Sequence, residues 1–114
     1  PFITDMYVLK FKANHFEVEV ADNGKEGIQK MKEFKPDVVL LDIVMPSMDG
    51  FEILQELRRI AQESQMGIKI ILLTNLGQKE DIDRGMKLGA DDYLIKAHFT
   101  PTEVVKKVEA ILLT

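Results

Sequence analysis

Three polar residues of different chemistry each follow a short apolar run in this 114-residue chain. They are Asp42, Thr74 and Lys96. A carboxylate can attack phosphorus and form an acyl phosphate, while a hydroxyl and an ammonium group can stabilise the charge on the transferring oxygens. If the three apolar runs are neighbouring strands, the residues that follow them predict a site for phosphoryl chemistry with Asp42 as the nucleophile.

Along the chain, the apolar runs alternate with segments whose apolar residues recur at helical spacing. Residues 38–41, 68–73 and 93–95 are short and almost continuously apolar, as expected of parallel strands buried on both faces. Residues 16–21 alternate apolar and polar residues, which predicts a half-buried strand. The remaining periodic segments predict five helices, at residues 1–13, 24–34, 51–61, 79–88 and from Pro101 onward.

Strict alternation of helices and short strands predicts one α/β domain, a doubly wound parallel sheet with helices on both faces. Ligands bind at the carboxyl ends of the strands in such sheets, so Asp42, Thr74 and Lys96 are expected at one edge. Gly89 is expected to end one helix in the left-handed conformation, and Thr100 with Glu103 predicts a capping box on the last helix.

The composition excludes several other classes of site. The formal net charge of −4 leaves no basic excess for a phosphate backbone, so nucleic acid is not expected as a direct partner. The chain has no Cys, which excludes disulfides, thiolate nucleophiles and Cys-ligated metals. No apolar run reaches the roughly 20 residues that span a bilayer, so we expect no membrane contact and a cytoplasmic location.

From its first helix to its last, the sequence resembles a response-regulator receiver domain. The segments that carry the resemblance occur in order and at suitable spacing: Val38–Pro46, Met48–Gly50, Leu72–Thr74 and Gly89–Lys96. The resemblance implies the flavodoxin-like strand order 2-1-3-4-5. It also implies that Asp42 is the phosphoacceptor, Thr74 the switch hydroxyl, Lys96 the lysine of the site and Tyr93 an aromatic rotamer switch.

The same resemblance implies a signalling role rather than an enzyme, apart from self-phosphorylation and autodephosphorylation. A sensor histidine kinase or a phosphotransfer protein would phosphorylate Asp42, and the aspartyl phosphate would draw Thr74 inward and let Tyr93 turn. These movements would alter the face formed by helix 79–88, strand 93–95 and the last helix, where a downstream protein or a second copy would bind.

Magnesium is the cofactor expected for this chemistry, held by Asp42 and the backbone carbonyl of Val44. The family begins with a strand that ends in an acidic pair, and the chain as given begins just after that pair. We therefore expect residues 1–114 to form a receiver domain truncated before its first helix, with strand 1 absent and Mg²⁺ binding weak or absent. An omitted segment, a strand supplied in trans, a fragment and a closed gap remain as explanations.

Two further positions depart from the family. Asn75 stands where a small residue usually follows the switch hydroxyl, and Ala97 stands where proline usually follows the lysine. We expect Asn75 to narrow access to Asp42, and the peptide before Ala97 to be trans. The pair Asp91 and Asp92 could imitate the missing acidic residues, but it precedes the last strand and is expected at the opposite edge.

Two other functions remain open. The chain could be a non-phosphorylated pseudo-receiver or an engineered fragment that acts as a binding or dimerisation module. It could also be a phosphatase of the haloacid-dehalogenase kind, which uses a strand-end Asp nucleophile; that family has a second Asp two residues later, and Val44 occupies the position here.

Overall fold

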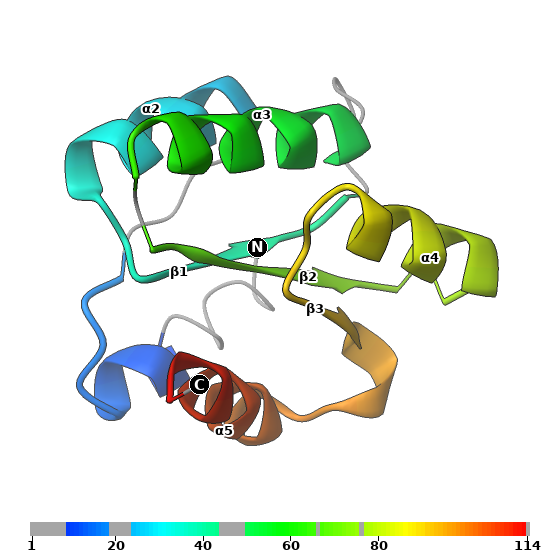
Figure 1. The fold of residues 1–114 in the computed structure, drawn as a ribbon. Helices are drawn as coiled ribbons and strands as arrows, with labels where there is room; N and C mark the ends of the chain where they lie inside the picture. The colour runs from blue at the N-terminus through cyan, green and yellow to red at the C-terminus, as the bar shows by residue number, and fades with distance from the viewer. Residues whose placement is uncertain (1–8, 19–23, 44–49, 66, 76, 114) are drawn as a thin grey trace.

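The described residues form a parallel sheet enclosed between helices (Figure 1). The computed structural model describes residues 9–18, 24–43, 50–65, 67–75 and 77–113. The strands are β1 (Val38–Leu41), β2 (Lys69–Thr74) and β3 (Asp92–Ile95), and they pair in the order β1-β2-β3. Both pairings are parallel, which confirms the expected order of the last three strands.

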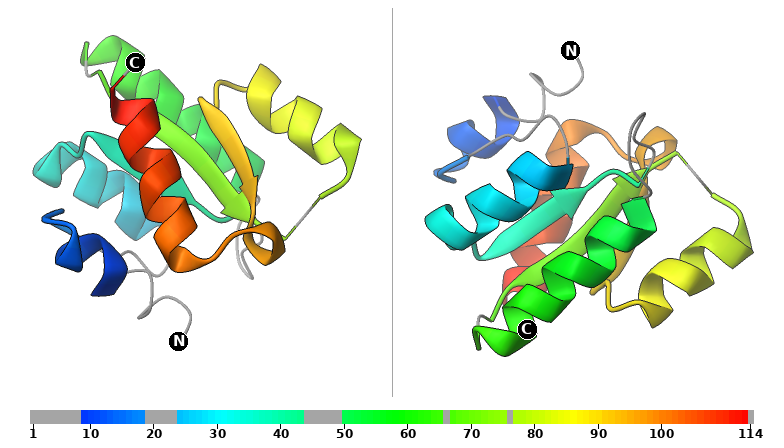
Figure 2. Two further views of the ribbon diagram at one scale, coloured as in Figure 1. Left: turned by 90° about the horizontal axis from the view of Figure 1, so that it is seen from below. Right: turned by 90° about the horizontal axis from the view of Figure 1, so that it is seen from above.

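Helices cover both faces of this sheet. The helices α2 (Gly24–Phe34) and α3 (Gly50–Glu63) lie on one face, and α5 (Pro101–Leu112) lies on the other beside the helical residues 9–13 (Figures 1 and 2). The shorter helix α4 (Lys79–Lys87) contacts β3 at the side of the sheet. The doubly wound architecture predicted from the alternation of apolar periods is therefore confirmed.

The central strand β2 is apolar from Ile70 to Leu73 because its two faces contribute to two different cores. Ile70 and Leu72 belong to the core beneath α2 and α3, which includes Met31 and Leu54. The alternate residues of the strand belong to a second core, whose buried members are Phe11, Ile71, Leu73, Leu94, Val104, Val105 and Val108. Successive strand residues point to opposite faces of the sheet. Because both faces of β2 are buried, successive residues are apolar instead of alternating between apolar and polar.

The strand predicted at residues 16–21 is not found in the described part of that segment. Residues 16–18 have no regular secondary structure, and residues 19–21 lie outside the described residues. His15 has a φ of 70°, and the Phe16 N–H donates to the Phe11 carbonyl at 3.0 Å. This amide closes the end of the preceding helix instead of joining a ladder, so the prediction is wrong for residues 16–18, and for residues 19–21 it stays a prediction.

The expected helix ends are confirmed at two places. Gly89 follows α4 with a φ of 112°, the left-handed conformation predicted for it. Thr100 caps α5: its Oγ1 accepts from the Glu103 N–H at 3.2 Å, and a Glu103 carboxylate oxygen accepts from the Thr100 N–H at 2.9 Å. Hydrogen bonds from Thr100 to the Glu103 carboxylate, chiefly the one from the Thr100 backbone, lower the pKa of Glu103.

Gly50 permits a close approach of the chain beside Asp42. It is the first residue of α3, and a Cβ added there would overlap the backbone of Ile43. The two residues flank the segment 44–49, so their contact brings the start of α3 against the residue that follows Asp42. Only glycine lacks the atom that would collide.

We predict that Gly50→Ala lowers the free energy of unfolding by about 3 kcal/mol, because backbone atoms must move to admit the methyl group. Urea denaturation would measure the change. Gly67→Ala is the matched control: Gly67 is exposed and nothing lies within 4 Å of its added Cβ, so this variant should unfold like the wild type. Equal stability of the two variants would contradict the close contact.

Candidate functional site

An ion pair joins the ends of the two outer strands of the described sheet. Asp42 directly follows β1 and Lys96 directly follows β3, and the Lys96 Nζ lies 2.7 Å from an Asp42 carboxylate oxygen. The Lys96 side chain is 27% exposed and that of Asp42 is 37% exposed. The ion pair is therefore open to solvent and accessible from the carboxyl edge of the sheet.

Thr74 ends the strand that lies between Asp42 and Lys96. It is the last residue of β2 and pairs in register with Ile95. Its side chain is fully buried, and it is the single buried polar side chain among the described residues. The sheet thus brings the carboxylate and the ammonium group into contact and places Thr74 at the end of the strand between them.

Tyr93 lies beneath α4 on the same face of the sheet as the core below α2 and α3. A Cβ on Gly85 of α4 would lie 3.2 Å from a Tyr93 ring carbon, so the absence of a side chain at Gly85 lets the ring pack against the helix. Burial raises the pKa of Tyr93, and the negative charges of Asp81 and Asp42 raise it further. The Tyr93 ring therefore packs against α4, and the charge of Asp42 contributes to its raised pKa.

The described residues do not by themselves suit a magnesium ion. Among them no group of three or more His, Cys, Asp or Glu side chains could hold a metal. Asp42 is the acidic residue at this edge, and one of its oxygens is engaged by Lys96. Val44, the other expected ligand, lies outside the described residues. Mg²⁺ requires near-octahedral oxygen ligands, and a single paired carboxylate is a poor match.

Asp91 lies at the opposite edge of the sheet, as the sequence predicted. Its Oδ2 accepts from the Ile70 N–H at 2.7 Å and from the Arg58 Nη2 at 2.6 Å. Arg58 also donates from Nε to the Gly89 carbonyl at 2.8 Å. Asp91 therefore joins α3 to the start of β2 and does not substitute for an acidic residue beside Asp42.

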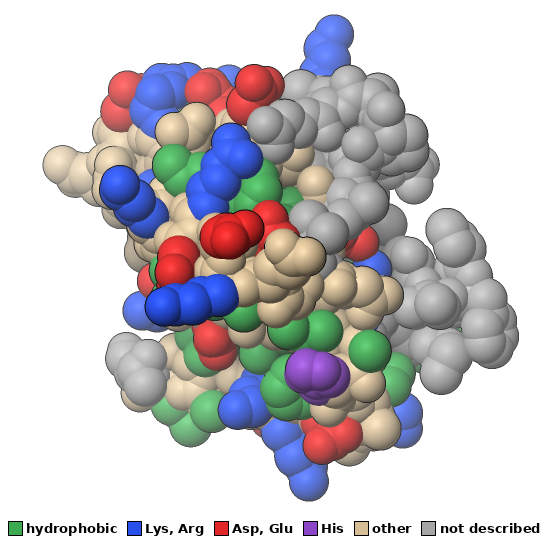
Figure 3. Space-filling view, turned by 90° about the vertical axis from the view of Figure 1, so that its right-hand side faces the viewer, with side chains coloured by type: hydrophobic (Ala, Val, Ile, Leu, Met, Phe, Trp, Pro, Cys, Tyr) green, Lys and Arg blue, Asp and Glu red, His purple; other side chains and the backbone are tan. Residues whose placement is uncertain are grey.

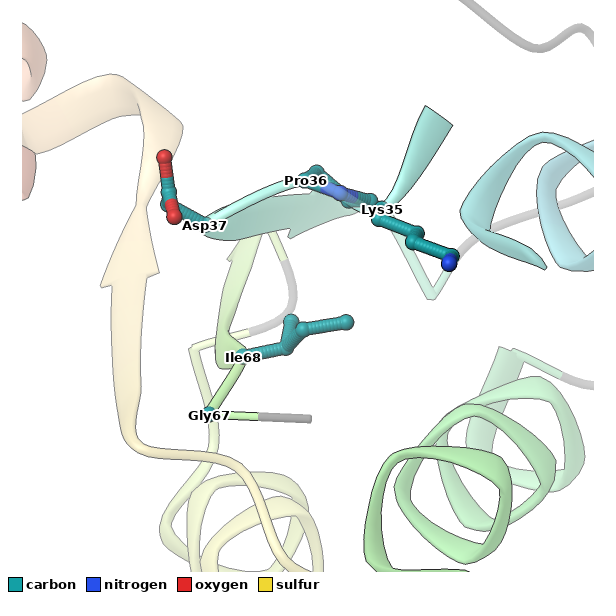
Figure 4. Close-up of a pocket in the computed structure, with 5 residues that line it drawn as sticks. All are labelled: Lys35, Pro36, Asp37, Gly67 and Ile68. Carbon is teal, nitrogen blue, oxygen red and sulfur yellow. The ribbon is translucent and has the colours of Figure 1, made fainter. Parts of the chain in front are cut away.

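A pocket near that opposite edge is separate from the ion pair. It is lined by Lys35, Pro36, Asp37, Gly67 and Ile68, which precede β1 and β2 (Figure 4). These residues lie at the amino ends of the two strands, whereas Asp42 and Thr74 lie at the carboxyl ends. The pocket is therefore not lined by Asp42, Thr74 or Lys96.

Sequence reasoning missed two sets of contacts, one at each edge of the sheet. The bonds of Arg58 join it to residues about 30 positions away, and no local pattern signals such pairs. Asn75 was expected to narrow access to Asp42, but its Oδ1 also accepts from the Ala97 N–H at 3.0 Å. No cis peptide bond occurs among the described residues, which confirms the trans peptide predicted before Ala97.

The sequence matches the family described as the response regulator receiver domain over residues 1–109. The chain belongs to the response-regulator receiver family. This receiver domain is 36% identical over 112 residues, 98% of its length, to the DNA-binding dual master transcriptional regulator RpaA of Synechocystis sp., of which it covers 45%. It is 32% identical over 112 residues, 98% of its length, to the DNA-binding response regulator MtrA of Mycolicibacterium smegmatis, of which it covers 46%.

Solved structures support the same assignment. The CheY-like response regulator receiver domain protein of Methanospirillum hungatei JF-1 superposes with a TM-score of 0.86 at 27% sequence identity. The match covers 96% of this chain and 84% of that one. The fold predicted for this receiver domain is therefore confirmed.

The receiver domain spans less than half the length of these two curated relatives. Both relatives are named as DNA-binding, so the expectation that nucleic acid is excluded as a direct partner is not supported. None of the helices in the described ranges combines the length and apolar character that crossing a bilayer requires.

We predict that Tyr93 ionises above the ordinary value of 10.0 and that its pKa falls in Asp81→Asn, while burial keeps it above that value. Alkaline titration of phenolate absorbance in a Tyr7→Phe background isolates Tyr93, because the chain has two tyrosines. Tyr93 stays protonated to a higher pH in the folded state than in the unfolded state. The free energy of unfolding should therefore decrease as the pH rises past 10.0. A titration unchanged by Asp81→Asn would contradict the proximity of the two residues.

Proposed function

We propose that this receiver domain accepts a phosphoryl group on Asp42 from a sensor histidine kinase or a phosphotransfer protein. The observation that carries the proposal is the 2.7 Å ion pair between Lys96 and Asp42 across the strand that ends in the buried Thr74. A structural salt bridge would explain the pair alone. The buried hydroxyl residue at the end of the strand between them, at the edge where parallel sheets bind ligands, favours the phosphoryl site.

In the proposed transfer, a carboxylate oxygen of Asp42 attacks the phosphorus of a phosphohistidine. An oxygen–phosphorus bond forms while the nitrogen–phosphorus bond breaks, and its electron pair returns to the imidazole of the donor. The Lys96 ammonium offsets negative charge on the phosphoryl oxygens, and the Thr74 hydroxyl donates a hydrogen bond to one of them. The product is an aspartyl phosphate with Lys96 as a counter-ion.

The output is a change in the face formed by α4, β3 and α5. Tyr93 packs against Gly85 of α4, so a movement of its ring would be felt by α4. Figure 3 views the molecule from the side at which α4 lies in Figure 1, and Lys and Arg side chains there are interspersed with Asp and Glu. Such a mixed surface suits a protein partner or a second copy of the chain.

The names of the relatives suggest the class of output. Relatives that match over almost all of this chain are named as transcriptional or DNA-binding regulators. We therefore propose that the switched face contributes to the control of transcription.

A second candidate function rests on the metal ligands. The described residues supply one acidic side chain at the site, and this favours a pseudo-receiver that binds a partner without being phosphorylated. In that case the Lys96–Asp42 ion pair would not be broken by phosphorylation, and the face of α4, β3 and α5 would bind its partner constitutively. Phosphorylation of Asp42 decides between the two functions.

Incubation with Mg²⁺ and acetyl phosphate should add a single phosphoryl group to the wild-type chain, detected by intact mass. Asp42→Asn should abolish the adduct because it removes the nucleophilic oxygen. Asp37→Asn is the matched control, since Asp37 is an exposed carboxylate at the other end of β1. An adduct that survives Asp42→Asn would refute Asp42 as the acceptor, and a folded wild type that gains no mass would favour the pseudo-receiver.

Replacing the lysine should slow the same reaction without abolishing it. We expect Lys96→Ala to lower the phosphorylation rate roughly 100-fold, because a charge that stabilises the transferring oxygens is lost. The rate is measured as the increase with time in the fraction of protein that carries the phosphoryl adduct. Lys107→Ala serves as the control, because Lys107 lies on α5 and stacks on Phe99 rather than contacting Asp42. Equal rates in Lys96→Ala and the wild type would contradict the role of the ion pair.

A further inference from the structure

The Asn75 side chain continues the pairing of β2 and β3 beyond the end of β2. Thr74 and Ile95 form the last register pair of the two strands. Among the described residues, a bond beyond this pair runs from the Ala97 N–H to the Asn75 Oδ1, at 3.0 Å. A side-chain carbonyl thus takes the place of the backbone carbonyl that would have extended the ladder.

This bond holds the backbone on the far side of Lys96. Ile95 is fixed by the ladder, and Ala97 is fixed by Asn75, so Lys96 lies between two tethered neighbours. Lys96 begins the single 3₁₀ turn η1 (Lys96–His98), whose closing bond from the Phe99 N–H to the Lys96 carbonyl is long at 3.3 Å. The turn therefore depends on an external bond for its position.

The position of this backbone determines where the lysine charge lies. A lysine side chain has four methylene groups and loses much rotamer freedom when its ammonium is held in one place. The Lys96 Nζ nonetheless lies 2.7 Å from Asp42, across the end of β2. A displaced or mobile Lys96 Cα would weaken this contact without any change in either charged group.

We infer that Asn75 is a positioning residue, whose hydrogen bond to the Ala97 amide holds the Lys96 ammonium on Asp42. The inference deepens the proposed function, on which its consequence for phosphoryl transfer rests. The bond requires an N–H at residue 97, which Ala97 supplies and a proline would lack, so Asn75 and Ala97 act as a matched pair. Asn75 also directly follows Thr74, and it therefore ties the segment carrying the hydroxyl to the segment carrying the lysine.

The hydrogen bond itself is tested by amide exchange at Ala97, measured by NMR. Asn75→Ala should speed exchange of this amide about fivefold, the effect of losing one hydrogen bond of ordinary strength. Asn75→Asp keeps an acceptor oxygen and should restore protection. Gln78→Ala is the matched control, because Gln78 is an exposed residue of the same connection and makes no capping bond through its side chain. Unchanged exchange in Asn75→Ala would overturn the inference.

The effect on the lysine is tested by the Lys96 13Cε resonance, which responds to the neighbouring carboxylate. Asp42→Asn defines the shift that accompanies loss of the ion pair, and Asn75→Ala should move the resonance in the same direction with Asp42 intact. Faster exchange at Ala97 with an unmoved Lys96 resonance would overturn the positioning role.

Phosphorylation by acetyl phosphate provides the third measurement. We expect Asn75→Ala to slow it about fivefold while Gln78→Ala leaves it unchanged, since the lysine is misplaced rather than lost. A wild type that gains no phosphoryl group would refute the proposed function, and the exchange and carbon measurements would still decide the inference about Asn75. A phosphorylated wild type with an equal rate in Asn75→Ala would refute the role of Asn75 in transfer.

Discussion

The parallel pairing of β1, β2 and β3 is the constraint on which the rest of the structure depends. Because all three strands run the same way, the residues that follow them meet at one edge, and Asp42 and Lys96 come into contact although 54 positions separate them. Burial of β2 on both faces fixes its place between the other two strands. Thr74 consequently ends the strand that lies between β1 and β3, and its side chain is fully buried.

The two edges of the sheet use their polar groups differently. At the amino edge, Asp91 is engaged by both Arg58 and the Ile70 amide, and these bonds hold α3 and β2 together. At the carboxyl edge, Asp42 and Lys96 pair with each other and both side chains are partly exposed to solvent. One edge thus stabilises the fold, while the other is open to ligands, as in other open α/β sheets.

Two glycines and one asparagine adapt the carboxyl edge of this particular chain. Gly50 lets the start of α3 approach the backbone beside Asp42, and Gly85 leaves room for the Tyr93 ring under α4. Asn75 replaces a backbone hydrogen bond where β2 has already ended. All three act through close contacts between separate segments of the chain, and none of them contributes a reactive group.

The sequence by itself determined the elements and the residues at their ends. Apolar periods identified β1, β2 and β3 to within one residue, because burial on both faces demands continuous apolar runs. The same method failed at residues 16–18, where the Phe16 amide bonds to Phe11 instead of to a strand. Only the tertiary structure decided that Lys96 touches Asp42, that Arg58 holds Asp91 and that Asn75 bonds Ala97. These contacts depend on the spacing and register of separate elements, and no local pattern encodes that geometry.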